Sequence, residues 1–389
     1  MARPALIEKL MQPAKWLFRK ELIPLDDIAG SGLKKISDKL NVDFSEMPAA
    51  QLRQMVLAMI LANGGLAVDN NGKLYVDFSQ MGTDRFDAMI EEFRKSLRLP
   101  KWLTGNLIVY VNANHAAAAD TLGEGRGLSA DMPFKTIQAA VNYLCENFNI
   151  GAYTATINVA AGEYAPVTLG DFSRTTGKIV LKGASGAIIS RNTVGFVVNV
   201  AAGYWQIENF KVIFDVEFGA STPAAVFMGA FNVADGSTLI SKGIDLNVKA
   251  SGTNSVSRIL YGYSVNGSLS IEPSEAQTKI VFDTDSVAYL TKYGMNSGGS
   301  ILLNSVADSS LNGNIVCSGD YTVFAVANSK GGITRSAVYA TKITFSGNCT
   351  GKRYDCNRGG TMSMVGAGAE YFPGNAAGTV DDSTYSWYK

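Results

Sequence analysis

The sequence predicts a mainly β protein whose short strands wind into a solenoid, preceded by a smaller α+β region. Glycine is abundant, with 40 residues against 10 prolines, and charged residues make up only 17% of the 389. Soluble globular chains usually carry about 25% charged residues. Short apolar runs recur from about residue 106 to about residue 346, and Gly, Asn or Asp separates most of them. These runs group into coils of roughly 20 to 30 residues, which is the period of solenoid proteins.

The first 105 residues differ from the rest because they are richer in Lys, Arg, Leu and Met. A Val-Asp-Phe-Ser repeat occurs at Val42–Ser45 and again at Val76–Ser79. Each copy leads into a stretch with helical spacing of apolar residues, Ala49–Leu61 and Thr83–Leu97. We therefore expect two turn–strand–helix units here. Units of this size bury little surface, so we expect them to need a partner chain or self-association.

The amino-acid composition changes at Pro100–Trp102, which separates this region from a central part at residues 106–350. The strands expected in the central part are Lys178–Leu181, Gly195–Val200, Trp205–Phe214, Ser237–Val248, Lys279–Phe282, Ser300–Leu303, Tyr321–Val326 and Thr341–Phe345. A helix is expected to start at Met132 and Pro133, since proline is favoured in the first helical turn. Its apolar face consists of Ile137, Ala140, Val141, Leu144 and Phe148.

The formal net charge is zero, and no basic stripe is present that would neutralise phosphates, so we expect no nucleic-acid partner. The N-terminus lacks the apolar core of a secretory signal. The longest apolar run, Met55–Ala62, is far shorter than the roughly 20 residues that span a bilayer. These features predict a chain made in a cytoplasm without a membrane anchor.

The four cysteines, Cys145, Cys317, Cys349 and Cys356, match no zinc spacing, and His115 is the single histidine. We therefore expect neither a metal nor any other cofactor. Cys349 and Cys356 are spaced to face each other across a hairpin. Free thiols in a reducing compartment are the favoured alternative.

Three segments around the expected helix carry a family resemblance. They are Gly125–Ser129, Pro133–Ala140 and Ile157–Tyr164, with the sequence Pro-Phe-Lys-Thr-Ile-Gln at the helix start. Together they resemble the opening of the pectate-lyase-like right-handed β-helices of bacteriophage tail fibres and tailspikes. In that family the helix caps the first coil of the solenoid. A solenoid end is an open sheet edge over an exposed core, so such a cover is physically required.

The C-terminus adds a second match to the same family. Gly351–Tyr354, Gly366–Gly368, Phe372–Gly374 and Ala377–Gly378 resemble the closing segment of many tail fibres. The repeated units of residues 1–105 are similar to fibre attachment regions. The resemblance implies a homotrimer of β-helices located in the virion tail. It also implies attachment through residues 1–105 to other tail or baseplate proteins, and a C-terminal tip at residues 351–389.

Tailspikes of this fold often cleave polysaccharides with paired carboxylates. The pairs available here are Asp283 with Asp285, Asp215 with Glu217, and Glu272 with Glu275. Residues two apart on a strand face the same side, so Asp283 and Asp285 can converge. No pair lies in a recognisable catalytic motif, and a solvated coil edge explains each of them. We therefore predict no catalytic residues.

Aromatic residues gather near the C-terminus and are the residues predicted to bind a receptor: Tyr371, Phe372, Tyr385, Trp387 and Tyr388. Aromatic rings stack on the apolar faces of sugars, while hydroxyl groups and amides hold the polar edges. Packing of the trimer end is the favoured alternative for Tyr371 and Phe372. For Tyr385, Trp387 and Tyr388, packing of the trimer end and receptor binding are equally favoured.

The sequence thus predicts a tail-fibre receptor-binding protein that attaches a virion to a bacterial surface glycan and is not an enzyme. The first alternative is a tailspike depolymerase, a glycoside hydrolase or lyase acting on capsule or lipopolysaccharide. The second is a structural connector on which other fibres dock.

Overall fold

The computed structural model divides the chain into two compact units, residues 1–102 and 103–389. It describes residues 33–36, 39–42, 66–68, 74–76 and 100–389. Within the last range it leaves out residues 124, 173, 175, 220–221, 223–226, 285–286, 288, 304–312, 329–336, 341–342, 365–367, 382, 384–385 and 389. Each unit is described by itself.

In the first unit the described strands form two antiparallel hairpins. β1 (Leu33–Ile36) pairs with β2 (Lys39–Val42), and β3 (Leu66–Val68) pairs with β4 (Leu74–Val76). Both copies of the Val-Asp-Phe-Ser repeat therefore start with the last residue of a hairpin. The two helical stretches expected after the repeats lie outside the described residues. β5 (Lys101–Trp102) closes this unit.

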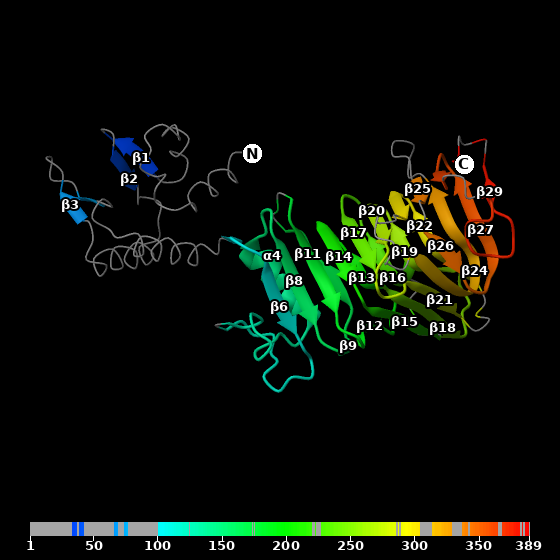
Figure 1. Cartoon of the computed structure of the whole chain (residues 1–389), viewed down its shortest axis with the longest axis horizontal. Helices are drawn as coiled ribbons and strands as arrows, with labels where there is room; N and C mark the ends of the chain where they lie inside the picture. Colours follow the sequence, from blue (N-terminus) through cyan, green and yellow to red (C-terminus); the bar gives the residue numbers. More distant parts are fainter. Residues whose placement is uncertain are drawn as a thin grey trace. The chain divides into compact units, whose positions relative to one another are not determined.

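The second unit contains a ten-stranded sheet, here called face A, in which all neighbouring strands run parallel (Figure 1). Its strands, in spatial order, are β6 (Leu107–Val111), β8 (Thr154–Val159), β11 (Lys178–Gly183), β14 (Tyr204–Glu208), β17 (Thr238–Lys242), β20 (Ser268–Glu272), β23 (Ser300–Leu303), β25 (Ala337–Ala340), β28 (Thr361–Ser363) and β30 (Trp387–Tyr388).

A 14-stranded sheet, also parallel, provides two more faces that are joined through the long strand β24 (Asn314–Asn328). Face B contains β9 (Gly162–Tyr164), β12 (Ala187–Arg191), β15 (Lys211–Phe218), β18 (Asp245–Gly252), β21 (Lys279–Asp283), the first half of β24 and β26 (Thr344–Ser346). Face C contains β10 (Val167–Leu169), β13 (Phe196–Val200), β16 (Phe227–Val233), β19 (Arg258–Val265), β22 (Leu290–Ser297), the second half of β24, β27 (Cys349–Asn357) and β29 (Thr379–Val380).

From β8 to β23 the strand number advances by three along each face, so one coil of this part of the chain contributes one strand to each of A, B and C. The first complete coil is β8, β9 and β10, and the second is β11, β12 and β13. Figure 1 shows these coils stacked from the end with β6 and β8 to the end with β27 and β29. The expected mainly β fold is confirmed, and the all-parallel curled sheets are consistent with a parallel β-helix.

The inner rows of the three faces form one continuous apolar core. On face A the register stacks Ile157, Leu181 and Ile207, all 0% exposed. Equivalent rows run through Ile189 and Val212 on face B and through Val198 and Phe231 on face C. Fully burying such a side chain stabilises the fold by about 1.5–3 kcal/mol. The repetition of these rows in every coil holds the stack together.

Two expected strands, Trp205–Phe214 and Ser237–Val248, are wrong because each is broken by a corner between faces A and B. Asn209 and Gly243 turn the chain there with φ values of 58° and 57°. The residues that follow, Phe210 and Ile244, point into the core at 1% and 0% exposure. Each turn is made by one left-handed residue followed by an apolar one. Only two or three non-apolar residues therefore interrupt the pattern at the corners, Glu208–Asn209 and Ser241–Gly243.

The expected helix is present as α4 (Ile137–Asn147), and its predicted apolar face is confirmed. Ile137, Ala140, Val141 and Leu144 are buried against β6, β8 and β10 of the first coil. The start is later than predicted, because Thr136 is the N-cap and accepts a bond from Ala139 N–H. The predicted fifth residue of the face, Phe148, is the C-cap and begins β7 (Phe148–Asn149).

The glycine-rich loop before α4 packs closely on it. A Cβ at Gly127, which has a φ of 76°, would overlap the Phe134 ring. The Asp120 carboxylate accepts hydrogen bonds from the N–H groups of Lys135 and Thr136, both at 2.9 Å. The loop and the helix therefore cover the start of the solenoid together.

Residue 351, where a C-terminal tip was expected to begin, lies within strand β27. Strands β27 and β29 continue face C, and β28 and β30 continue face A. The C-terminal segment is the last part of the same stack, because its strands pair in register with those of the preceding coil.

Candidate functional site

A polar cleft of about 380 Å³ lies on the outside of the coils, where face B leads into face C. Its lining residues are Glu163, Pro166, Ser190, Arg191, Asn192, Thr193, Ile213 and Asp215. The first three coils supply them through β9, β12 and β15 and the turns that follow. The Ser190 hydroxyl donates to Glu163 Oε1 at 2.6 Å. Hydroxyl, amide, guanidinium and carboxylate groups thus surround one cavity, which is the donor and acceptor set that a polyhydroxylated ligand requires.

The Arg191 side chain lies between this cleft and Phe196, the first residue of strand β13 on face C. Its Nε donates to Thr193 O at 3.1 Å, and its Nη1 donates to Phe196 O at 3.0 Å. Gly195 has a φ of 117°, and a Cβ there would lie 2.8 Å from the guanidinium carbon. The chain therefore folds closely around the Arg191 head group. Burial lowers the pKa of Arg191, although a guanidinium stays charged at neutral pH.

An aromatic row begins at Phe196 and continues over the next coils on the outside of face C. It consists of Phe196, Phe227, Tyr261 and Tyr293, each in the first half of its strand. The ring centroids of Phe196 and Tyr261 are 6.4 Å apart, and those of Tyr261 and Tyr293 are 5.6 Å apart. The Phe227 ring stacks on Tyr261 at 6.1 Å. The row therefore follows the direction in which the coils stack.

Backbone geometry creates the space for this row. Gly229 is in register with Phe196 and Tyr261, so it occupies the row position of its own coil. Its φ is 153°, and a Cβ there would overlap the Tyr261 backbone. Because Gly229 has no side chain, Phe227, two residues earlier, supplies the ring for this coil.

The row combines exposed aromatic surface with neutral hydroxyl groups. Phe227 is 57% exposed, Phe196 and Tyr293 are partly exposed, and Tyr261 is buried beneath its neighbours. Burial raises the pKa of both Tyr261 and Tyr293, so both hydroxyl groups stay protonated and can donate hydrogen bonds. These four residues were not predicted from the sequence. Their recurrence about one coil apart, each at a strand start, was the available signal.

The predicted carboxylate pairs are placed on coil surfaces among cations. Glu272 forms an ion pair with Lys242 at 2.8 Å. Asp215 and Asp283 are both in register with Lys249, which lies between them on face B. Asp285 lies outside the described residues. Alternating charges on neighbouring strands attract each other, so this pattern stabilises the sheet surface.

Asp215 shares the polar cleft with Glu163, a carboxylate that is 52 positions earlier in the sequence and was not predicted as its partner. Glu163 is in register with Ile188 and, one strand further, with Lys211, four residues before Asp215. Ideal strand geometry then separates the two Cα atoms by about 16 Å. Glycoside hydrolases place their carboxyl groups about 5–9.5 Å apart. The two carboxylates thus line one cleft from β9 and β15, with Ser190 of β12 beside Glu163.

The C-terminal aromatic residues are mostly packed rather than displayed. Phe372 is 1% exposed and its ring contacts Phe345 at 5.7 Å, so it is unable to stack on a ligand. Tyr371 donates its hydroxyl to Ile343 O. Tyr388 stacks on Tyr354 at 4.1 Å, whereas Trp387 on β30 is 41% exposed. This favours the packing alternative for Tyr371 and Phe372. Tyr385 lies outside the described residues.

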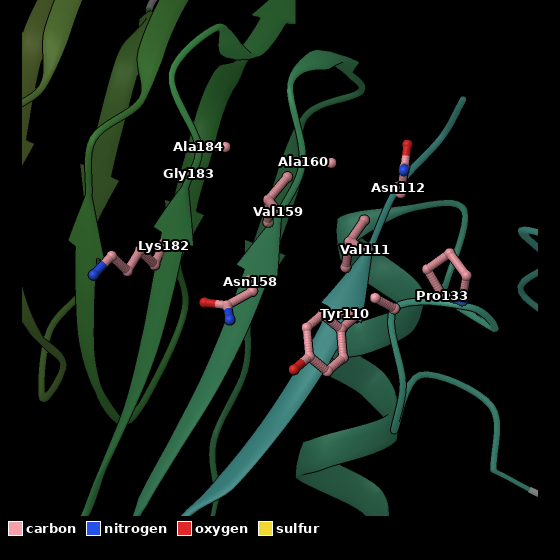
Figure 2. Close-up of a pocket in the computed structure, with 11 residues that line it drawn as sticks. Tyr110, Val111, Asn112, Pro133, Asn158, Val159, Ala160, Lys182, Gly183 and Ala184 are labelled. Carbon is pink, nitrogen blue, oxygen red and sulfur yellow. The ribbon is translucent and has the colours of Figure 1, made fainter. Parts of the chain in front are cut away.

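A second cleft of about 360 Å³ lies at the capped end of face A (Figure 2). Tyr110, Asn158 and Lys182, from β6, β8 and β11, line it as register neighbours. Lys182 Nζ is 4.0 Å from Glu208 Oε2, so its charge already has a neighbour. With a single ring on its surface, this cleft offers less aromatic area than the row on face C.

His115 and the cysteines have structural positions. His115 Nδ1 accepts from Ala117 N–H at 3.2 Å and shapes the loop before α4. Cys349 and Cys356 do not face each other across a hairpin, because both belong to the single strand β27. Among the described residues, no helix is long and apolar enough to cross a membrane. Comparisons with protein-family models, curated proteins and solved structures found no match.

Proposed function

We propose that this chain is a tail-fibre subunit of a tailed bacteriophage that binds a bacterial surface glycan through the flank between faces B and C. The aromatic row of Phe196, Phe227, Tyr261 and Tyr293 is the observation that carries the proposal. Successive rings of an extended polysaccharide can lie along it, because the row and the coil stack have the same direction. The polar cleft at Arg191 then receives the hydroxyl groups of the glycan.

The fold and the family resemblance support the rest of this assignment. Parallel crossover connections are nearly always right-handed, so we take the coils to be right-handed. As in the resembling fibres, three copies would associate, and residues 1–105 would attach them to other tail proteins. The subunit would then lie in the virion tail with the flank exposed to the host surface.

Binding through the flank can be tested with Phe227→Ala in the full-length protein. The probes are immobilised bacterial capsule and lipopolysaccharide O-chains, followed by calorimetric titration of the glycan that binds best. Loss of one stacked ring of about 1 kcal/mol should weaken that binding about five- to tenfold. The fold should persist because the Phe227 side chain is more than half exposed.

Two matched variants locate the site. Leu302→Ala removes an exposed apolar side chain from face A and should leave affinity unchanged. Trp387→Ala tests the C-terminal end and should also leave it unchanged. If Trp387→Ala alone weakens binding, the site lies at the C-terminus. If no glycan binds, the proposed function is wrong.

The proposal is binding without cleavage. The bound glycan, incubated with the protein, should keep its length on size-exclusion chromatography. Shortening of the glycan would favour the depolymerase alternative and would point to the cleft carboxylates Glu163 and Asp215.

A further inference from the structure

Two thiols from neighbouring coils meet near the C-terminal end of the core. Cys317 lies on β24 and is 0% exposed, and Cys349 begins β27 on the adjacent coil and is half-buried. The register places Cys349 opposite Gly319, two residues after Cys317. Each thiol shifts the pKa of the other, so the two side chains lie within interaction distance.

The backbone between them is folded to permit this approach. Gly347, which is next in line to pair with Cys317, has a φ of 108°, and a Cβ there would overlap the Cys317 carbonyl oxygen. Gly319 has a φ of 110°, and its N–H donates to Asn348 O at 3.2 Å. Two left-handed glycines thus draw β24 and the start of β27 together at this point.

A buried tyrosine fixes the surroundings of the thiol pair. Tyr321 is 2% exposed and donates its hydroxyl to Ile280 O at 2.9 Å. Hydrogen bonds with Cys317 and with Tyr321 lower the pKa of the Cys349 thiol, whereas burial raises that of Cys317. The more accessible thiol is therefore also the more readily ionised one, and thiolates are the nucleophiles in disulfide exchange.

We propose that Cys317 and Cys349 are a disulfide-forming pair that covalently joins two consecutive coils when the protein meets a small-molecule disulfide. The Cys349 thiolate attacks one sulfur of the small disulfide, forms a mixed disulfide and releases one small thiolate. Cys317 then loses its proton to that thiolate and attacks Cys349 Sγ, which releases the second small thiolate. Two protein thiols are oxidised, and one small disulfide is reduced to two thiols.

The test uses the full-length native protein, incubated with oxidised glutathione or with dithiothreitol. The protein is then unfolded, alkylated and weighed intact. The chain has four cysteines, so we expect four alkyl groups after dithiothreitol and two after oxidised glutathione. Peptide mapping should join Cys317 to Cys349. The oxidised form should also melt at a higher temperature, since the cross-link restricts the unfolded chain.

Single variants provide the controls. Cys145→Ser removes a distant thiol from α4, so the oxidised protein should still lose two alkylation sites. Cys349→Ser should lose none and should show no melting difference between the two treatments. Four alkyl groups on the oxidised wild type, glutathione retained on Cys349, or a cross-link to another cysteine would each overturn the proposal. The number of alkyl groups on the oxidised wild-type protein tests the proposal even if a variant folds poorly.

Discussion

The outer rows of faces A and C lie on the same coils but carry opposite chemistry. On face A, Lys182, Glu208, Lys242 and Glu272 follow one another in register and alternate in charge. On face C, the corresponding surface carries the aromatic row. The inner rows behind both are apolar apart from groups such as the Ser241 and Tyr263 hydroxyls, which hydrogen-bond to each other. The interior repeats in each coil and sets the fold, whereas each outer row is free to serve a different purpose.

The charged side chains in the outer row of face A form ion pairs with one another. Each carboxylate lies between two ammonium groups or beside one, at the roughly 4.8 Å spacing of paired strands. A partner would have to displace these ion pairs. The aromatic row offers exposed ring surface that no ion pair occupies, which is why it is the better candidate for binding.

The largest effect on stability is expected when an inward-facing side chain of face A is removed, which tests whether inner and outer rows have separate roles. Trp205 is 0% exposed, and its Nε1 donates to Gly170 O at 2.9 Å. Trp205→Ala should lower the free energy of unfolding by about 3–5 kcal/mol, because it leaves a cavity in the core. Denaturant titration measures the change. The matched truncation Leu302→Ala, on the outside of face A, should cost far less. Equal losses would contradict the separation of inner and outer roles.

A smaller effect is expected at the edge between faces B and C, where Asp320 Oδ2 lies 2.6 Å from Lys292 Nζ. The hydrogen bond from Lys292, aided by one from Thr350, lowers the pKa of Asp320, although burial partly opposes this. The unfolded state therefore binds the proton more tightly. The stabilisation is complete above the unfolded pKa of about 3.9 and is lost as pH falls through the lower folded pKa.

Asp320→Asn should therefore destabilise the protein at pH 7, by at most about 1 kcal/mol because the carboxylate is largely exposed. The difference from wild type should shrink as the pH falls below 4. Thermal unfolding at several pH values measures it, with Asp235→Asn as an exposed control. A difference that stays constant with pH would show that the ion pair is not its source.

The smallest effect is expected within the charged row. Lys242→Ala breaks the ion pair with Glu272, yet both side chains remain partly exposed. Surface pairs of this kind contribute about 0–1 kcal/mol, and salt screens them. The loss should therefore be less than about 1 kcal/mol and should diminish in high salt. A larger, salt-independent loss would mean that the row supports the fold itself.

Several elements of the fold could be predicted because their signals are local. The α4 face repeats every three or four residues, and strands such as Lys279–Asp283 alternate apolar and polar side chains. The corners between faces A and B were missed at Asn209 and Gly243, since a one-residue turn leaves only a short polar stretch that resembles the alternation within a strand. The strand β19 was missed because its sequence is buried on both sides and shows no alternation.

The candidate site was harder to predict, because it is assembled from neighbours about one coil apart in the sequence. Phe196 and Tyr261 stack although 65 positions separate their numbers. The outward position of the Phe227 ring depends on the backbone at Gly229. The burial of the Phe372 ring depends on the packing of the last coils. The cysteine partner of Cys349 likewise follows from coil register, not from spacing along the chain.

By itself, the sequence determined the mainly β fold class and the helix that covers the start of the coils, because glycine content, apolar runs and helical spacing act over a few residues. Only the tertiary structure decided which surface is aromatic, which carboxylates are paired with lysines and which thiols meet. Those outcomes depend on the register between coils, and register is set by the packing of the whole apolar core and not by any single segment.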